Sequence, residues 1–139
     1  MREIVLRATK EDMQKAMDLL EKELTVHNCA ELSKMQFIIA FEELFVNIVH
    51  YAYDDGDGMV SMLYEFVRDE NKEVLLKVKL VDSGVAYNPL VKSEPNIELP
   101  TKERKIGGLG ILMAKKFLDE ITYERSDKQN SLSFVKKLG

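Results

Sequence analysis

Three glycines fall within four positions of the chain, at Gly107, Gly108 and Gly110, and an apolar segment of helical spacing begins at Leu109. Because glycine is costly inside a helix, a cluster that opens one indicates a backbone that turns freely and lies close to something. A helix N-terminus presents N–H groups without helical partners and the positive end of the helix dipole, and both attract phosphate. Three basic residues precede the cluster and could screen a triphosphate: Lys102, Arg104 and Lys105. A tight turn before a helix would explain the same glycines.

A carboxylate and an amide lie one helical turn apart at Glu43 and Asn47, in a segment that is otherwise strongly apolar. This spacing places the two side chains next to each other on a helix, and His50 falls near the same side. The side-chain oxygen of Asn47 suits Mg²⁺, and Glu43 could take a proton from a water or a hydroxyl group. A solvent-facing polar stripe or a buried hydrogen-bonded pair would have the same spacing.

A third polar motif, residues 82–89 (DSGVAYNP), directly follows an alternating apolar run. An aspartate at the end of a strand, Asp82, can accept a hydrogen bond from an exocyclic amine, and Gly84 would let a flat ring such as adenine approach the backbone. An ordinary turn is the alternative, because Asp-x-Gly and Asn-Pro are common turn formers.

Several classes of site are excluded by the sequence. It contains no GxxxxGK[ST] phosphate loop, and its glycine cluster does not follow a strand as a dinucleotide-binding fingerprint requires. The net charge of -4 argues against a broad nucleic-acid surface, so we expect no direct nucleic-acid partner. The single cysteine, Cys29, excludes an internal disulfide and a multi-cysteine metal site, which suits a reducing compartment.

The length of 139 residues, with 45% hydrophobic and 32% charged residues, is typical of one globular domain, so we expect a single domain over residues 1–139. The N-terminal sequence lacks the apolar stretch of a secretory signal, and no run of about 18 apolar residues occurs. We therefore expect a cytoplasmic protein without a membrane segment.

The elements that must position the motifs follow from periodicity. Helices are expected over residues 11–27, 32–53 and 109–118. Strands are expected over residues 2–7, 59–68, 73–81, 120–125 and 131–138. The second helix has a wide apolar stripe and is the expected central helix. The second and third strands should form a hairpin, and the last two a closing pair with residues 126–130 as the turn.

All three prolines fall between Asp82 and Lys105, where the sequence has no helical or strand period. A connection of this length inside a compact domain is usually functional, so we interpret it as a lid that covers a ligand. Residues 91–105 should become ordered when a triphosphate and Mg²⁺ bind.

Taken in this order, the three motifs resemble those of the GHKL (Bergerat-fold) ATPases, specifically their small bacterial branch of anti-sigma factor serine-protein kinases. Glu43 and Asn47 match the N box of that family, residues 82–89 its first glycine box, and residues 107–110 its second. The resemblance covers nearly the whole chain. One position departs from the family pattern, because Tyr51 stands where members often have a histidine.

The resemblance implies an α/β fold, a two-layer α+β sandwich with a mixed sheet and helices on one face, that holds ATP and Mg²⁺ between helix and lid. By position, Asp82 would accept from the adenine amine, Asn47 would bind the metal, and Glu43 would act as the base. The other residues expected to contact the nucleotide are Gly84, Tyr87, Lys105, Gly107, Gly108, Leu109 and Gly110.

The function that the resemblance implies is a kinase that moves the γ-phosphate of ATP to a serine or threonine. Its protein substrate would be a small anti-sigma-factor antagonist, with a sigma factor as a further partner and a homodimer as the typical assembly. A non-catalytic, nucleotide-dependent protein-binding module of the same fold is the alternative. The catalytic part of a sensor histidine kinase would need an additional histidine-bearing helical segment.

Overall fold

The computed structural model describes residues 1–53, 58–91 and 109–139, and it describes residues 109 and 110 by their backbone alone. In chain order the elements are β1 (Arg2–Arg7), α1 (Lys10–Val26), α2 (Glu31–Tyr51), β2 (Met59–Arg68), β3 (Val74–Asp82), α4 (Leu109–Phe117), β4 (Glu120–Ser126) and β5 (Gln129–Lys137). Every predicted helix and strand is confirmed, with ends that differ by at most two residues. The predicted lid, residues 91–105, lies outside the described residues except for Val91.

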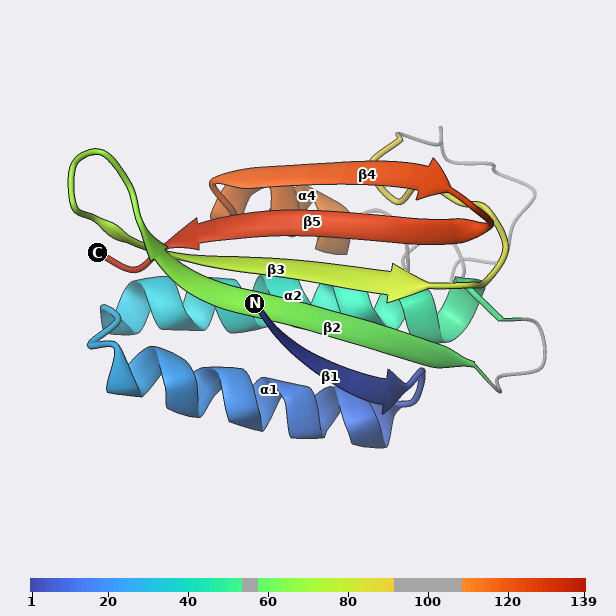
Figure 1. The fold of residues 1–139 in the computed structure, drawn as a ribbon, viewed down its shortest axis with the longest axis horizontal. Coiled ribbons are helices and arrows are strands. Elements are labelled where there is room, and N and C mark those ends of the chain that lie inside the picture. The colour runs from blue at the N-terminus through green and yellow to red at the C-terminus, as the bar shows by residue number, and fades with distance from the viewer. Residues whose placement is uncertain (54–57, 92–108) are drawn as a thin grey trace.

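The five strands form one sheet in the order β1-β2-β3-β5-β4 (Figure 1). Each neighbouring pair is antiparallel, including the predicted β2–β3 hairpin. The expectation of a mixed sheet is therefore wrong for the described residues. Strand β4 does run in the same direction as β3, but β5 lies between them and is antiparallel to both, so no parallel strands are neighbours.

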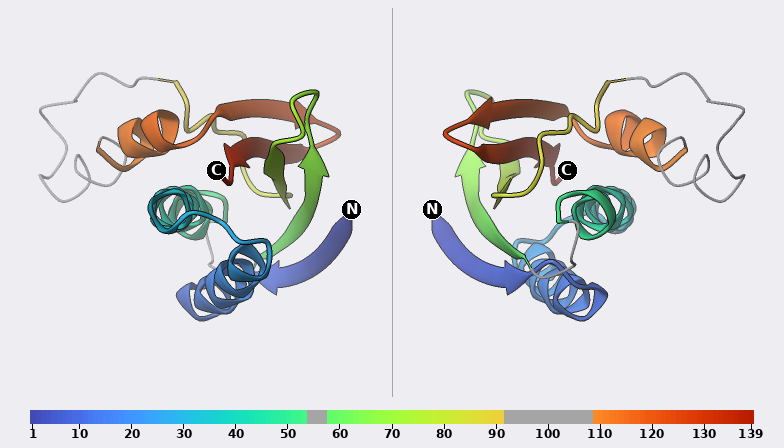
Figure 2. Two further views of the ribbon diagram at one scale, coloured as in Figure 1. Left: turned by 90° about the vertical axis from the view of Figure 1, so that its left-hand side faces the viewer. Right: turned by 90° about the vertical axis from the view of Figure 1, so that its right-hand side faces the viewer.

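The helices form a second layer on one face of the sheet, as expected (Figure 2). Helix α2 is the central helix, with α1 on one side and α4 on the other. In β3 the inward side chains alternate with lysines on the opposite face, which is typical of an antiparallel sheet covered on one side. Across the described ranges, no helix combines the length and apolar character that crossing a bilayer requires.

Aromatic side chains fill the space between α2 and the sheet. Phe37, Phe41 and Phe45 lie on successive turns of α2 and are fully buried. The ring of Phe41 lies 5.7 Å from that of Phe45 and 6.3 Å from that of Phe134 in β5, measured between centroids. This cluster joins the central helix to an inner strand of the sheet.

Replacement of Phe41 should test how much this packing contributes. A buried phenylalanine changed to alanine loses its transfer free energy and leaves a cavity, so Phe41→Ala should lower the free energy of unfolding by about 3–5 kcal/mol. Leu32→Ala is the matched control, because Leu32 is 62% exposed on the same helix, and it should change stability by less than about 0.5 kcal/mol. Urea unfolding followed by circular dichroism measures both, and equal losses would contradict this account of the core.

Candidate functional site

Two of the three polar motifs lie toward the same end of the sheet (Figure 1). Glu43 and Asn47 lie in the C-terminal half of α2, and Asp82 is the last residue of β3. The third motif is only partly described: Lys105, Gly107 and Gly108 lie outside the described residues. Leu109 and Gly110 are the first residues of α4, which packs against α2, so a helix does begin at Leu109 as the sequence predicts.

Asp82 is a buried carboxylate, with 3% of its surface exposed. Its Oδ1 atom accepts two hydrogen bonds, from the backbone N–H of Gly84 at 2.9 Å and from Nδ2 of Asn130 at 2.9 Å. The Asn130 amide also donates to the carbonyl oxygen of Val85 at 2.8 Å and accepts from the hydroxyl of Tyr123. Three neighbouring strands therefore contribute to holding this one carboxylate.

Asn130 is a candidate-site residue that the sequence interpretation misses, because the periodicity assigns it to the turn over residues 126–130. The structure places it inside β5, with 3% exposure, directly opposite Asp82 in the β3–β5 register. The available signal was the alternation of β5, in which Asn130 shares a face with the apolar residues Leu132 and Phe134. A polar residue in an inward strand position indicates a buried hydrogen bond rather than a turn.

Gly84 lies against the end of α2. A Cβ atom at this position would come within 2.0 Å of the carbonyl oxygen of Ala52, and the next residue, Val85, donates its N–H to that same oxygen at 2.8 Å. We expected Gly84 to leave room for a flat ring, but in the described structure the missing side chain leaves room for the helix terminus. A ring contact at Gly84 stays a prediction.

The remainder of the loop after β3 is also tied down. Arg125 donates from Nη1 to the Gly84 carbonyl oxygen at 2.8 Å, and Lys115 donates from Nζ to the Leu90 carbonyl oxygen at 2.7 Å. The hydroxyl of Tyr53 accepts from the Ser83 N–H at 2.9 Å. The first part of the connection that we interpret as a lid is thus held by bonds to α4, to β4 and to Tyr53, two residues after α2.

The amide of Asn47 is 4% exposed and its orientation is defined by one bond. Its Nδ2 donates to the backbone carbonyl oxygen of Glu43 at 2.7 Å, so the two residues are joined as the spacing predicts, although through the backbone of Glu43 and not its side chain. With the nitrogen engaged in the helix, Oδ1 is the Asn47 atom that suits a hard cation. No cluster of three His, Cys, Asp or Glu residues that could hold a metal occurs in the part of the chain that the structure describes.

The Glu43 side chain is half-buried. Desolvation, together with the negative charge of neighbouring Glu42, raises the pKa of the Glu43 carboxyl group above its ordinary value of 4.5. A raised carboxyl pKa is typical of a group that accepts and releases protons. His50, by contrast, is exposed, and its ring lies edge-on to Tyr51 with centroids 6.2 Å apart.

Two tyrosine rings lie beside each other near the loop after β3. Tyr87 packs against the core, and its ring lies 6.1 Å from that of Tyr51, measured between centroids. Burial raises the pKa of the Tyr87 phenol well above its ordinary value, and the charge of Asp82 adds to this effect, so Tyr87 is a neutral hydrogen-bonding group. Tyr51, which stands where the resemblance leads us to expect a histidine, therefore faces an aromatic neighbour rather than a charged one.

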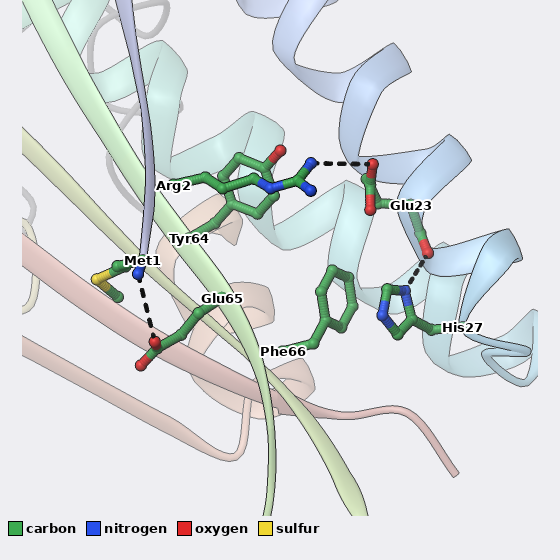
Figure 3. A pocket seen from close by; sticks show the side chains of 7 residues that line it. All are labelled: Met1, Arg2, Glu23, His27, Tyr64, Glu65 and Phe66. Atoms are coloured by element: carbon green, nitrogen blue, oxygen red, sulfur yellow. Dashed lines mark hydrogen bonds and ion pairs between the residues drawn. The ribbon is translucent and has the colours of Figure 1, made fainter.

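A separate hollow of about 220 Å³ lies between β1, β2 and α1 (Figure 3). Its β2 residues pair with the first half and middle of β3, away from Asp82. Arg2 and Glu23 form an ion pair at 4.0 Å there, and the ring of His27 stacks on that of Phe66 with centroids 3.7 Å apart. This hollow is not part of the candidate site.

Comparisons with known proteins agree with the fold. A sequence model of a family, described as histidine kinase-like ATPase domain, matches residues 6–136. Serine/threonine-protein kinase BtrW of Bordetella bronchiseptica is 27% identical over 94 residues, which cover 68% of this chain and 63% of BtrW. The chain thus spans less than two thirds of the length of that relative.

Two solved structures share the fold. The RsbU and RsbW domains of Rv1364c from Mycobacterium tuberculosis match with a TM-score of 0.61 and 12% identity, over 99% of this chain and 33% of that one. The SiaB–SiaC complex from Pseudomonas aeruginosa matches with a TM-score of 0.59 and 16% identity, over 99% of this chain and 89% of that one. These likenesses establish the fold. The chemistry of the site has to be inferred from its own residues.

A side chain at Gly84 should disturb the contact between the loop and α2. Gly84→Ala places a methyl group against the Ala52 carbonyl, and overpacking of this kind typically costs about 1–3 kcal/mol. The Val85 amide should then exchange its hydrogen faster, because it loses its bond to Ala52. Thermal unfolding and amide hydrogen exchange test this, with Ser83→Ala at an exposed neighbouring position as the control. Unchanged exchange at Val85 would show that the contact is not needed.

Proposed function

We propose that this chain, which belongs to the histidine kinase-like ATPase family, binds ATP and transfers its γ-phosphate to a serine or threonine of a small partner protein. The observation that carries the proposal is the hydrogen bond between Val85 and Ala52, which joins the loop after Asp82 to the helix that bears Asn47. One nucleotide could then contact a base-recognising carboxylate and a metal-binding amide at the same time.

The adenine end of the nucleotide would be recognised by Asp82. Among the described residues, both side-chain hydrogen bonds of Asp82 go to Oδ1, so Oδ2 is the oxygen that we assign to the exocyclic amine of adenine. Gly84 and Tyr87 would border the same ring. The burial of Asp82 supports this role, because a hydrogen bond in a dry site discriminates strongly between donors and acceptors.

The phosphate end would lie toward Asn47 and the first turn of α4. Asn47 Oδ1 fits a Mg²⁺ ligand because the amide nitrogen is held by Glu43, and the ion when bound would neutralise charge on the phosphate oxygens. The N–H groups at the start of a helix suit phosphate. The residues that we propose on these grounds are Lys105, Gly107, Gly108, Leu109 and Gly110.

Glu43 would accept the proton of the attacking hydroxyl group. Its carboxyl group lies one helical turn before Asn47, and its raised pKa makes it a better base than an ordinary glutamate. Proton transfer of this kind requires the ionised form, so activity should fall as the pH drops through the raised pKa of Glu43. A module that only binds nucleotide would not need such a group beside the metal.

The relatives guide the choice of protein partner. BtrW is named as a serine/threonine-protein kinase, and SiaB was solved in complex with SiaC. For this chain we propose a small anti-sigma-factor antagonist as the phosphorylated protein, a sigma factor as the regulated target, and a homodimer as the assembly.

Nucleotide preference tests the assignment of Asp82. ATP should bind about 5- to 150-fold more tightly than GTP, since the guanine carbonyl at the same ring position cannot donate to a carboxylate. Isothermal titration calorimetry with Mg²⁺ present measures both affinities. Equal affinity for the two nucleotides would remove Asp82 from the base-binding role.

Two substitutions on α2 separate catalysis from binding. Glu43→Ala should keep ATP affinity within a few-fold but lower phosphoryl transfer by about 10²–10⁴, the usual range for a general base. Asn47→Ala should weaken ATP binding and transfer together, because the metal holds the phosphates in both states. Transfer from radiolabelled ATP to a partner captured on the immobilised chain measures the rates.

Glu42→Ala is the matched control, because Glu42 is the exposed neighbour of Glu43 on the same helix. It should transfer phosphate at the wild-type rate, with the acid limb of the pH profile shifted slightly down because Glu42 contributes to the raised pKa of Glu43. A Glu43→Ala protein as active as wild type would refute the base assignment. A wild-type protein that binds ATP and transfers nothing would favour the non-catalytic binding module.

A further inference from the structure

We propose that Tyr123 and Asn130 form a positioning pair that fixes the direction of the Asp82 carboxylate, and thereby determines the preference for a nucleobase with an exocyclic amine over one with a carbonyl. The inference rests on the proposed function, since it concerns the nucleobase end of the same site. It adds two residues, from β4 and β5, that none of the three polar motifs contains.

The orientation of the Asn130 amide is fully determined by its surroundings. Its Nδ2 group donates to the Val85 carbonyl oxygen at 2.8 Å and to Asp82 Oδ1 at 2.9 Å, and both partners are acceptors. Its Oδ1 accepts from the hydroxyl of Tyr123. A rotated amide would face two acceptors with its oxygen and the tyrosine hydroxyl with its nitrogen, so the observed orientation is the one that satisfies every atom.

This amide in turn limits how the Asp82 carboxylate can rotate. Oδ1 is held between the Asn130 amide and the Gly84 N–H, each at 2.9 Å. Because both donors converge on Oδ1, Oδ2 is directed to a defined position and offers only acceptor capacity there. A base with an N–H donor is matched to that position, and a base with a carbonyl oxygen is repelled by it.

The sheet makes the arrangement rigid. Asp82 and Asn130 are directly opposed in the β3–β5 register, and β4 carries Tyr123 on the far side of β5. Asp82 and Asn130 are each 3% exposed. Polar groups in such a dry setting have few alternative partners, so the loss of one hydrogen bond changes the direction of the next group rather than being replaced by water.

The alternative is that the pair only closes the end of the sheet. A structural role of that kind would weaken the binding of all nucleotides alike, because the whole site would loosen. A positioning role would instead change the ratio of affinities for bases that differ at the exocyclic group. Inosine triphosphate provides this comparison, since it has a carbonyl oxygen where ATP has the amine, with a proton on the adjacent ring nitrogen as the accompanying difference.

Calorimetric titration with ATP and with inosine triphosphate tests the inference. Wild type should prefer ATP by about 5- to 150-fold. Asn130→Leu should reduce that ratio by about tenfold, mainly through loss of ATP affinity. Tyr123→Phe, which retains the ring and removes only the hydroxyl, should reduce the ratio by about threefold. Glu124→Ala, at an exposed position beside Tyr123, should leave the ratio unchanged.

The outcomes separate the two proposals. If the ratio of ATP affinity to inosine triphosphate affinity stays at the wild-type value in both Asn130→Leu and Tyr123→Phe, the positioning role is overturned. ATP binding by wild type would still support the proposed function in that case. A wild type that binds neither nucleotide would overturn the proposed function and this inference with it. Should Asn130→Leu fail to fold by circular dichroism, the ratio in Tyr123→Phe decides.

Discussion

The backbone of Gly84 lies directly against the carbonyl group of Ala52 at the C-terminal end of α2. A Cβ atom would come within 2.0 Å of that oxygen, and the Val85 N–H donates to it at 2.8 Å. The last carbonyls of a helix lack helical partners, so this bond satisfies one of them and fastens the loop to the helix. The distance between Asp82 and Asn47, and hence the size of any molecule that touches both, depends on this contact.

The site is built from buried polar groups that are bonded to the protein on one side. Asp82 is held through Oδ1, and Asn47 is held through Nδ2. In each case we propose that the oxygen left over binds a ligand, an amine at Asp82 Oδ2 and a cation at Asn47 Oδ1. The protein thus orients these groups without a ligand, and such preorganisation lowers the entropic cost of binding one.

The sequence predicts the helices and strands well, because their periodicities are strong and local, as in the aromatic stripe of α2 and the alternation of β3. It predicts the sheet less well, since the place of β5 between β3 and β4 depends on contacts between distant segments. The sequence interpretation misses the contact of Gly84 with Ala52, and it assigns Asn130 to a turn. Both omissions have one cause: the partner lies more than 30 positions away in the sequence, Ala52 for Gly84 and Asp82 for Asn130.

The central claim is that α2 and the loop after β3 bind one ATP molecule between them, with its base at Asp82 and its metal at Asn47. A crystal structure with Mg²⁺ and a non-hydrolysable ATP analogue tests it most directly. The account predicts the exocyclic amine at hydrogen-bond distance from Asp82 Oδ2, about 2.7–3.2 Å, and the ion about 2.1 Å from Asn47 Oδ1. An analogue bound at saturation that contacts neither residue would contradict it.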